Sequence, residues 1–506
     1  MANVVEMKNI TKVFPGVVAN DNVNFALEQG EIHVLLGENG AGKTTLMNQL
    51  YGLYEPTSGE IYINGKLTNI KDPNVAISMG IGMVHQHFML VEPFTVAENI
   101  ILGSEPSLNG GVKLDMEKAV KDVEEISTKY GLKVDPNVKI QDISVGMQQR
   151  VEILKALYRG ADILILDEPT AVLTPQEIEE LGEILRKLTK QGKSIILITH
   201  KLKEVMAMSD RVTVIRRGKK IETLKNENTN TDELAEIMVG RKVNLVVDKD
   251  EKVAGDVVMS VKNLEALDNR GIPALKGVSF EVKAGEIFAV AGVDGNGQSE
   301  LVEVITGLRK ATGGSVNLLG TDLTNKPTKS VIDAGVSHIP EDRHKRGLVL
   351  QHTLAENSVL GTHRDEPFSK SGVLDYSIIH DFCLELIEEF DVRTPNEKVA
   401  AKSLSGGNQQ KLIVARELSR KPELLIASQP TRGVDVGAIE FIHKRLVAER
   451  DKNKAVLLVS LELDEVMALA DRIAVVYDGQ IVGIINGKDA TEKELGIMMA
   501  GGSQKK

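Results

Sequence analysis

The sequence contains almost no cysteine, no tryptophan and no long apolar run. Cys383 is the one cysteine among 506 residues, which excludes an internal disulfide and is typical of a reducing compartment. It lies in an apolar helical pattern, so we expect it in a hydrophobic core. The longest apolar runs, such as 195–198 and 455–459, have the length of strands. A bilayer span takes about 20 apolar residues, so any role at a membrane would depend on a partner.

The sequence also lacks an excess of positive charge. It has 61 Lys and Arg residues and 72 Asp and Glu residues, a net charge of −11. This balance argues against nucleic acid or an anionic membrane as the main partner. The first residues carry no basic segment followed by an apolar one, so we expect no signal peptide. With 42% apolar and 26% charged residues, the composition is that of a soluble globular protein. The length predicts two or three domains.

The chain contains one unit twice. Early in the unit, residues 30–32 (Gly-Glu-Ile) recur at 285–287, an offset of 255 residues. Later, residues 210–212 (Asp-Arg-Val) recur as Asp-Arg-Ile at 471–473, an offset of 261 residues. The change of offset indicates a small insertion. A period this long indicates a duplicated domain and not a solenoid.

The seam between the copies is charged, contains glycine and lacks a helical apolar period. These features are typical of a linker. We therefore predict a first domain at residues 1–245, a linker at 246–256 and a second domain at 257–506.

The first copy contains a glycine loop between a strand pattern and a helical pattern, Gly37-Glu38-Asn39-Gly40-Ala41-Gly42-Lys43-Thr44. This context is that of a phosphate-binding loop. The backbone N–H groups of such a loop turn toward phosphate oxygens, and the helix N-terminus adds partial positive charge. Lys43 can reach the outer phosphates of a nucleotide, and the Thr44 hydroxyl can ligate Mg²⁺. We count Thr45, the next residue, with the nucleotide-binding set.

Two carboxylates follow another apolar strand pattern, at 163–166. Four apolar β-forming residues in a row indicate a strand buried on both faces. The carboxyl ends of parallel strands border the ligand crevice. Asp167 would suit Mg²⁺ through water, and Glu168 would suit activation of an attacking water. The alternative is a capping pair before the next helix.

Three further residues could reach the same nucleotide. Gln86 follows a short apolar pattern and could ligate Mg²⁺ or the attacking water. His200 follows the apolar run at 194–199 and could contact the γ-phosphate, although a lone histidine is more often structural. Phe14 lies 23 residues before the loop and could stack on a base, although position alone favours an ordinary core phenylalanine.

A mainly helical stretch at 88–142 interrupts the strand–helix alternation, which predicts an inserted helical subdomain. It contains an amphipathic helix at 115–130 with Asp115 as a plausible N-cap. Next, Ser144-Val145-Gly146-Met147 precede a helix that we expect at 148–158. Small residues at a helix start suit an anion.

Taken in order, these residues resemble the ATP-binding domain of ABC transporters. They correspond to the family's A-loop, Walker A motif, Q-loop, signature loop, Walker B motif with its catalytic glutamate, and switch histidine: Phe14, Gly37–Thr44, Gln86, Ile143–Met147, Asp167-Glu168 and His200. The resemblance implies an α/β fold of two fused P-loop ATPase domains, each with a parallel-sheet core, an N-terminal antiparallel part and a helical subdomain. It also implies ATP and Mg²⁺ as ligands. The implied catalytic residues are Glu168, His200, Lys43 and Gln86, and the implied metal ligands are Thr44, Gln86 and Asp167.

Two fused ATPase domains resemble the subunits that power bacterial importers of ribose, galactose and nucleosides. Three stretches look most like the nucleoside branch, whose binding protein is a membrane-anchored lipoprotein: 84–91, 143–150 and 292–299. The resemblance implies two membrane-spanning permease partners, an indirect lipoprotein partner and a place on the cytoplasmic face of the membrane. No nucleoside pocket is visible in the sequence itself.

The second copy keeps the scaffold and loses the chemistry. The counterparts of Lys43, Gln86, Asp167, Glu168 and His200 are Gln298, Glu341, Ser428, Gln429 and Leu461. The counterpart of Phe14 falls near Asp268 or Asn269, neither of them aromatic. Loss of a general base alone typically costs about 10²–10⁴-fold in rate, so we expect no fast hydrolysis here. Weak nucleotide binding by the second copy remains an alternative, because its loop keeps the glycines and Ser299.

The signature loop, unlike the other motifs, is closer to the family pattern in the second copy than in the first. Residues 404–408 (Leu-Ser-Gly-Gly-Asn) are close to the family's L-S-G-G-Q, whereas the first copy has Val145 where the backbone should approach phosphate. A β-branched side chain obstructs that approach. The pattern makes sense if the copies pack head to tail and share their nucleotides. Ser405, Gly406 and Gly407 would then complete the site of Lys43, and Ser144 would face the degenerate loop of Gln298.

The D-loops differ too. Residues 171–174 (Ala-Val-Leu-Thr) lack the family's usual aspartate, whereas Asp435 keeps it in the second copy. The effect of Thr174 stays open.

The leading interpretation is an importer ATPase, for nucleosides, with one competent and one degenerate site. A sugar importer of the same architecture is the alternative. A tandem ABC protein that binds the ribosome is a less favoured one, because such proteins generally keep both sites competent and carry a long basic linker. Here the linker is short and of mixed charge, and the net charge is −11.

Overall fold

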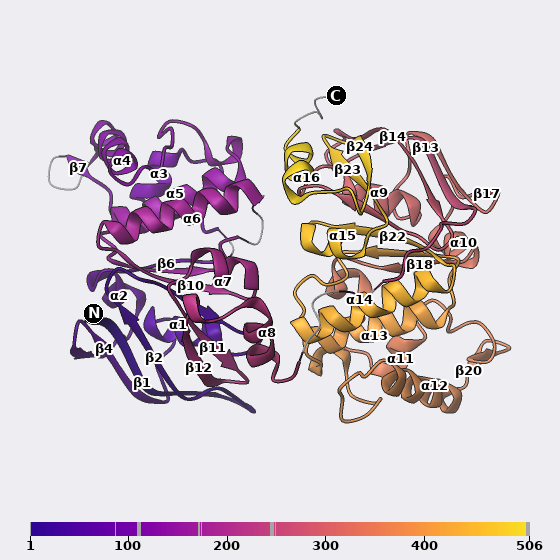
Figure 1. The fold of residues 1–506 in the computed structure, drawn as a ribbon, viewed down its shortest axis with the longest axis horizontal. Coiled ribbons are helices and arrows are strands. Elements are labelled where there is room, and N and C mark those ends of the chain that lie inside the picture. Colours follow the sequence, from indigo (N-terminus) through magenta and orange to yellow (C-terminus); the bar gives the residue numbers. More distant parts are fainter. Residues whose placement is uncertain are drawn as a thin grey trace. The chain divides into compact units, whose positions relative to one another are not determined.

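The computed structural model describes residues 2–86, 88–108, 113–170, 173, 175–242, 247 and 249–501. His87 and most of the first D-loop, including Thr174, lie outside the described residues. By its internal contacts the chain divides into two compact units, residues 1–243 and 244–506 (Figure 1). In the described part of the chain, no helix is long and apolar enough to cross a membrane.

The first unit begins with an antiparallel sheet in the order β2-β1-β4-β5. Its strands are β1 (Asn3–Phe14), β2 (Val17–Glu28), β4 (Ser58–Ile63) and β5 (Lys66–Thr68). Apolar residues alternate along β1 and β2, and one face packs into a core with the phosphate-loop helix α1 (Lys43–Leu50). This sheet is the antiparallel part that the resemblance implied.

The core of the first unit is a six-stranded sheet in the order β12-β11-β3-β10-β9-β6. All its neighbours are parallel except β11 and β12. The strands are β3 (Ile32–Leu36), β6 (Ile81–Val84), β9 (Ile163–Asp167), β10 (Ser194–Thr199), β11 (Arg211–Arg216) and β12 (Lys219–Lys225). Because β3, β6, β9 and β10 are parallel, their carboxyl ends lie at one edge, which brings the residues that follow them together.

Helices cover this sheet and form the predicted insertion. They are α2 (Pro73–Ser78), α3 (Val96–Ile101), α4 (Met116–Tyr130), α5 (Val145–Tyr158), α6 (Pro175–Lys190), α7 (Leu202–Met208) and α8 (Thr231–Val239). The amphipathic helix is confirmed, and the Asp115 carboxylate accepts from the Lys118 N–H at 3.0 Å as its N-cap. The mainly helical insertion also includes a short hairpin, β7 (Ser107–Leu108) with β8 (Lys113–Leu114).

The predicted start of the fifth helix was wrong. We expected it at Gln148, but α5 begins at Val145. The Ser144 hydroxyl accepts from the Met147 N–H at 3.3 Å, so Ser144 is the N-cap and the signature residues form the first turn.

The second unit repeats this architecture. Its antiparallel sheet, β14-β13-β16-β17, contains β13 (Val257–Leu267), β14 (Pro273–Lys283), β16 (Gly313–Leu318) and β17 (Thr321–Asp322). Its six-stranded sheet, β18-β21-β22-β15-β23-β24, contains β15 (Ile287–Ala291), β18 (Val336–Ile339), β21 (Leu424–Ser428), β22 (Ala455–Ser460), β23 (Arg472–Tyr477) and β24 (Gln480–Asn486).

The helices of the second unit follow the same order as those of the first. They are α9 (Gln298–Ile305), α10 (Thr328–Asp333), α11 (Leu354–Ser358), α12 (Tyr376–Glu389), α13 (Gly406–Ser419), α14 (Val436–Asp451), α15 (Leu463–Leu469) and α16 (Glu492–Met499). A hairpin of β19 (Ser369–Lys370) and β20 (Val373–Leu374) precedes α12. Cys383 on α12 is fully buried, as predicted.

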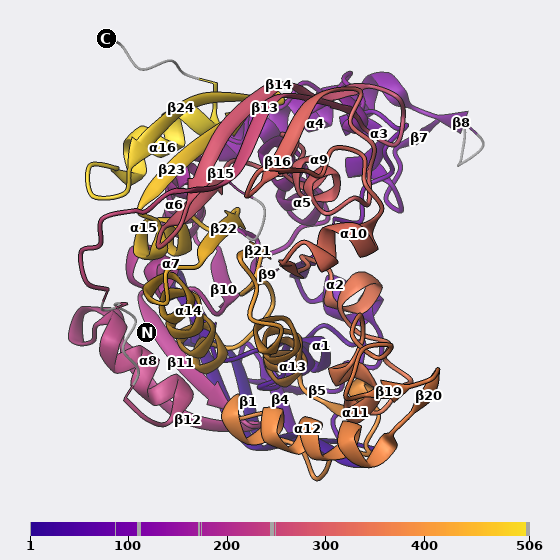
Figure 2. The same ribbon diagram turned by 90° about the vertical axis from the view of Figure 1, so that its right-hand side faces the viewer.

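The core sheet of the second unit is buried on both faces. Alternate residues of β15 enter two hydrophobic clusters: Ile287, Ala289 and Ala291 join the helices, and Phe288 and Val290 join the antiparallel sheet. The two views agree that α11 and α12 lie on one side of this sheet and β13 and β14 on the other (Figures 1 and 2). Strands with two buried faces explain the continuous apolar runs of the sequence.

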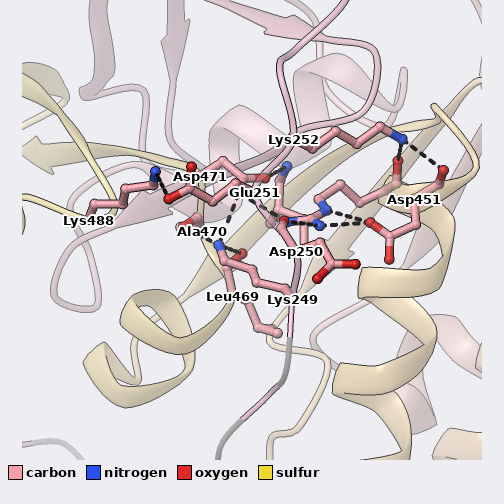
Figure 3. Close-up of polar contacts among 11 residues, drawn as sticks. Lys249, Asp250, Glu251, Lys252, Asp451, Leu469, Ala470, Asp471 and Lys488 are labelled. Carbon is pink, nitrogen blue, oxygen red and sulfur yellow. Dashed lines mark hydrogen bonds and ion pairs between the residues drawn. The ribbon is translucent and has the colours of Figure 1, made fainter.

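The predicted linker makes ordered contacts with the second unit (Figure 3). The Lys249 ammonium donates to the last carbonyls of α15, of Leu469 and Ala470, at 2.8 and 2.7 Å. The Lys252 ammonium donates to carbonyls at the end of α14, the closer at 2.7 Å. Lysine at a helix C-terminus satisfies open carbonyls and complements the helix dipole. The lysines of this charged segment therefore bind two helix ends of the second unit.

Candidate functional site

The glycine loop of the first unit connects β3 to α1, as the sequence predicted. Gly42 is the N-cap of α1 with φ of 100°, a conformation that L side chains rarely adopt. A Cβ on Gly42 would lie 2.3 Å from the Ala19 carbonyl oxygen, and one on Gly37 would lie 2.2 Å from that of Ile215. Among the described residues, no side chain caps α1. Its first N–H groups are thus left for an anion.

Lys43 turns its ammonium into this loop. Its Nζ donates to the carbonyl oxygens of Gly37 at 2.8 Å and Glu38 at 3.0 Å, and the side chain is buried. Burial lowers the pKa of Lys43, and the carboxylates of Glu168 and Asp167 oppose that shift. A charged donor that is bound only by loop carbonyls can exchange them for phosphate oxygens.

Thr44 and Asp167 form a pair of hard oxygen ligands. Thr44, the second residue of α1, lies close enough to the Asp167 carboxylate at the end of β9 to lower its pKa. Burial raises the pKa of Asp167, and Thr44 and the Lys43 charge act in the opposite direction. A hydroxyl beside a carboxylate suits Mg²⁺, which prefers oxygen ligands. These residues therefore fit the predicted metal.

Glu168 lies at the centre of the polar residues at this sheet edge. Its Oε2 accepts from the Gln86 amide at 3.0 Å, and its Oε1 pairs with His200 Nδ1 at 2.9 Å. Burial acts to raise the pKa of Glu168, but the His200 hydrogen bond and the charges of His200 and Lys43 bring it below the usual value. Glu168 is therefore ionised near neutral pH, the state that a general base requires.

The backbone of Glu168 is strained. Its φ of 47° lies in the left-handed region, which a non-glycine residue adopts only at a cost of about 1–3 kcal/mol. Such strain persists where the surrounding structure enforces it, often at functional sites.

Phe14 lies outside the buried core. It is half-buried at the end of β1, where its ring contacts the Tyr54 ring edge-on with centroids 5.4 Å apart. Lys12 Nζ lies 5.3 Å from the ring centroid. The place of Phe14 in the sequence favoured an ordinary core residue, and that expectation is wrong. Stacking of Phe14 on a nucleotide base stays a prediction.

The two signature loops are both helix N-termini. The Ser405 hydroxyl accepts from the Asn408 N–H at 3.4 Å as the N-cap of α13, and Gly406 and Gly407 follow in the first turn. In the first unit Ser144 is the N-cap in the same way, but Val145 follows it with 40% of its surface exposed. The loops thus differ in the bulk beside the cap and not in the backbone.

Two residues that the sequence analysis did not name support these loops. Asn20, fully buried on β2, donates to the Gly42 carbonyl at 3.0 Å and accepts from Gln49. Arg343 donates to the Arg432 and Gly433 carbonyls at 2.9 and 3.3 Å, and its guanidinium lies against Gly406. The role of Asn20 could have been suspected from the sequence, because it is a polar residue on the apolar face of a predicted strand. Arg343 had none, because 63 residues separate it from Gly406.

In the second unit the same positions form a different set. Gln429 repeats the φ of 47° of Glu168, and its amide oxygen accepts from the Leu461 N–H at 3.5 Å. α9 begins at Gln298 after Gly297 with φ of 99°, so the loop backbone is preserved. An amide and a leucine thus stand where the first unit has its carboxylate–histidine pair.

Comparison with known proteins identifies the family. The sequence matches the family described as ABC transporter twice, at residues 20–171 and 275–432. The chain belongs to the ABC transporter family. The family resemblance is confirmed, and so is the α/β fold of two P-loop ATPase domains. The chain is accordingly an ATP-binding ATPase that works in transport.

Three relatives show the range of the similarity. The chain is 58% identical over 505 residues to the nucleoside import ATP-binding protein NupA of Lactococcus lactis, with 99% of each chain covered. It is 56% identical to the guanosine import ATP-binding protein NupO of Bacillus subtilis, with 100% of this chain and 99% of the relative covered. A putative ribose/galactose/methyl galactoside import ATP-binding protein of Geobacillus kaustophilus is 39% identical, with 97% and 96% covered.

Proposed function

We propose that this chain is the energy-coupling ATPase of a nucleoside importer. It acts on the cytoplasmic face of the membrane through two permease subunits, which receive the nucleoside from a substrate-binding lipoprotein. Identity of 58% and 56% to nucleoside and guanosine import proteins over the whole chain carries the choice of substrate. The sugar-import relative, at 39%, supports the alternative less well.

The contacts of Glu168 support its role as the catalytic base. The phosphates of ATP would bind the loop N–H groups, and Lys43 would exchange the Gly37 and Glu38 carbonyls for the outer phosphate oxygens. Glu168 would take a proton from water as the water oxygen bonds to the γ-phosphorus and the bond to ADP breaks. His200 and Gln86 hold both carboxylate oxygens in place.

Mg²⁺ completes this site in the proposal. Thr44, Gln86 and, through water, Asp167 would bind the ion, which would neutralise charge on the phosphates. The hydroxyl–carboxylate pair of Thr44 and Asp167 supports this assignment.

The competent site is composite in this proposal. The loop of Lys43 and the signature residues Ser405, Gly406 and Gly407 would enclose one ATP, with the two units packed head to tail. The glycines in the first turn of α13 support the role of the signature loop, because they add no Cβ where phosphate would approach the helix N-terminus. In the first unit's signature loop the exposed side chain of Val145 would obstruct the approach of phosphate, which argues against a second competent site.

A cavity beside the Q-loop offers a place for a permease. It has a volume of about 170 Å³ and borders His85, next to Gln86. Apolar side chains such as Met83 and Met89 line it together with charged ones such as Lys155. In the proposal a short cytoplasmic helix of a permease docks here, so that its movement reaches Gln86 and through it Glu168.

Uptake by a deletion strain of the source organism tests the proposal. The gene is restored either as wild type or as Glu168→Gln, and uptake of labelled uridine, adenosine, guanosine, ribose and galactose is measured. We expect the wild type to restore nucleoside uptake. We expect Glu168→Gln to restore none, because the amide cannot accept the proton of water, although the purified variant should still bind ATP.

Restored uptake of ribose or galactose without nucleosides would select the sugar alternative. Hydrolysis of ATP by Glu168→Gln at near the wild-type rate would contradict the assignment of the base. Co-purification with ribosomes and not with membranes would contradict the importer as a whole.

A further inference from the structure

Glu204 is a buried carboxylate that the proposed mechanism does not use. It is the third residue of α7, and only 4% of it is exposed. Its Oε1 accepts from the Thr170 hydroxyl, and its Oε2 accepts from the Thr199 hydroxyl at 2.8 Å. Both threonines are themselves buried. Because burial of a carboxylate is costly unless its oxygens are hydrogen-bonded, the two hydroxyls are tied to this side chain.

The two hydroxyls come from the segments that carry the proposed base and the switch histidine. Thr170 lies two residues after Glu168, beyond the end of β9. Thr199 is the last residue of β10 and directly precedes His200. The two strands are neighbours in the core sheet. Glu204 therefore forms a bridge between the segments that follow them, from a helix that belongs to neither strand.

This bridge bears on the contact between the base and the histidine. Glu168 Oε1 pairs with His200 Nδ1 at 2.9 Å, and this distance depends on the spacing of the two segments. A displacement of about 1 Å at a reacting group can cost about 10²-fold in rate. One carboxylate that binds both segments limits such a displacement.

The second unit has the same carboxylate in a different set of contacts. Glu465, the third residue of α15, is 5% exposed. Its Oε1 accepts from the Thr431 hydroxyl at 2.8 Å and pairs with His443 Nε2 of α14 at 3.0 Å. Its Oε2 has no hydrogen-bond partner among the described residues. This carboxylate therefore joins one strand end to a helix and not to the neighbouring strand end.

The hydroxyl that could complete the bridge in the second unit has another contact. Ser460 is the counterpart of Thr199, and its hydroxyl accepts from the Glu462 N–H at 3.1 Å. The Thr199 hydroxyl accepts from the Lys201 N–H in the same way, at 3.0 Å, and also donates to the carboxylate. The local turn is thus the same in both units. The unit that lacks the base and the switch histidine also lacks the bridge.

We propose that Glu204 is a positioning residue for ATP hydrolysis. Through the two threonine hydroxyls it holds Glu168 and His200 at hydrogen-bonding distance. Glu204 contacts neither the nucleotide nor the attacking water in this proposal, so its loss should lower kcat and leave ATP binding unchanged. The proposal rests on the proposed role of Glu168 as the base and does not depend on the transported molecule.

Steady-state ATP hydrolysis by the full-length protein tests the proposal. In Glu204→Gln only one side-chain oxygen remains as an acceptor, so the two threonine hydroxyls can no longer both donate to it as before. We expect kcat to fall about 10- to 100-fold, with the KM and the binding of a non-hydrolysable ATP analogue unchanged. Glu465→Gln is the matched control. It should keep the wild-type kcat, because its carboxylate does not join the segments of a base and a histidine.

Thr199 supplies variants that leave Glu204 in place. Thr199→Val removes the hydroxyl at nearly constant volume and should lower kcat as Glu204→Gln does, whereas Thr199→Ser should restore it. The double variant should lose no more than either single one, because both changes break the same bridge. Ser460→Ala removes the equivalent turn contact in the second unit and should keep the wild-type kcat.

Wild-type kcat in both Glu204→Gln and Thr199→Val would overturn the proposal. An equal fall of kcat in Glu465→Gln would also overturn it, as would losses that multiply in the double variant. If urea unfolding shows that Glu204→Gln does not fold, the comparison of Thr199→Val with Thr199→Ser decides.

Glu168→Gln is measured in parallel to separate this inference from the proposed function. Wild-type hydrolysis by Glu168→Gln would refute the base itself. An inactive Glu168→Gln beside a fully active Glu204→Gln would refute only the positioning role. Neither result depends on which molecule the importer carries.

Discussion

Glu168 and Gln429 show how the two pockets diverged at the level of a residue. Both have φ of 47° at the end of a core strand. The strained backbone therefore survives without the carboxylate that it presents in the first unit. Strain of about 1–3 kcal/mol persists only where packing enforces it. The scaffold, and not catalysis, imposes this conformation, and one side chain decides whether the position can act as a base.

His338 provides a prediction about stability at this scale. Burial on β18 lowers its pKa from 6.5 to about 4, and its Nε2 has no partner among the described residues. The unfolded chain therefore takes up a proton first as the pH falls. The free energy of unfolding should decline from pH 6.5 to about 4, by at most roughly 3 kcal/mol from this group.

The equivalent residue of the first unit, Met83, supplies the test variant. We expect His338→Met to weaken the loss of stability between pH 6.5 and 4, measured by urea unfolding at several pH values. A variant with the same pH dependence as the wild type would contradict the role of His338. Comparison with the wild type cancels other titrating groups, such as His33, that both proteins share.

At the level of elements, most of the proposed catalytic residues lie at the start of a helix or the end of a strand. Parallel strands bring their carboxyl ends to one edge, so Gln86, Glu168 and His200 meet although more than 110 residues separate the first from the last. Helices α1 and α13 begin next to glycines, which add no side chain where an anion would approach a helix N-terminus.

The equivalent caps of α5 and α13 allow a controlled test of the composite site. The Ser144 and Ser405 hydroxyls accept from the N–H three residues on at 3.3 and 3.4 Å. Replacing either serine by arginine removes a cap worth about 1 kcal/mol, so both variants should lose similar stability. We expect Ser405→Arg to abolish ATP hydrolysis and Ser144→Arg to retain most of it. Equal loss of activity in the two would contradict the head-to-tail pairing.

At the level of the whole molecule, both units keep the fold, but each keeps only part of the residues proposed to bind and hydrolyse ATP. Both units keep a parallel sheet, a phosphate loop and a capped signature helix. The proposed base and switch histidine occur only in the first unit, and the pair of signature glycines occurs only in the second. When both pockets hold ATP, we therefore expect one chain to hydrolyse only one of the two molecules.

A single-turnover experiment tests that count. The full-length protein is loaded with labelled ATP and Mg²⁺, freed from unbound nucleotide, incubated and quenched with acid. We expect about half of the bound label to remain ATP, because the second pocket lacks a base. In Glu168→Gln all of it should remain ATP. Complete conversion to ADP in the wild type would contradict this expectation, because the second pocket would then either hydrolyse ATP or hold none.

Much of the site was predictable because its motifs are local. The spacing from Gly37 to Thr44 predicted the loop, and the apolar runs before Asp167 and His200 predicted buried strands that end in polar residues. The start of α5 was missed because Ser144 caps it, so residues 145–147 are helical despite their loop-like composition. The exposure of Phe14 could not be predicted from the sequence, because it depends on contacts with residues such as Tyr54 that are distant in the chain.

The sequence by itself determined the duplication, the family, the phosphate loop and the loss of Lys43, Glu168 and His200 in the second copy. These features depend on residue identity and short spacing, which chain order preserves. Only the tertiary structure decided that Glu168 is held by Gln86 and His200, and that Ser299 meets Glu341. Such pairs form between residues tens of positions apart, so folding and not local pattern brings their atoms into contact.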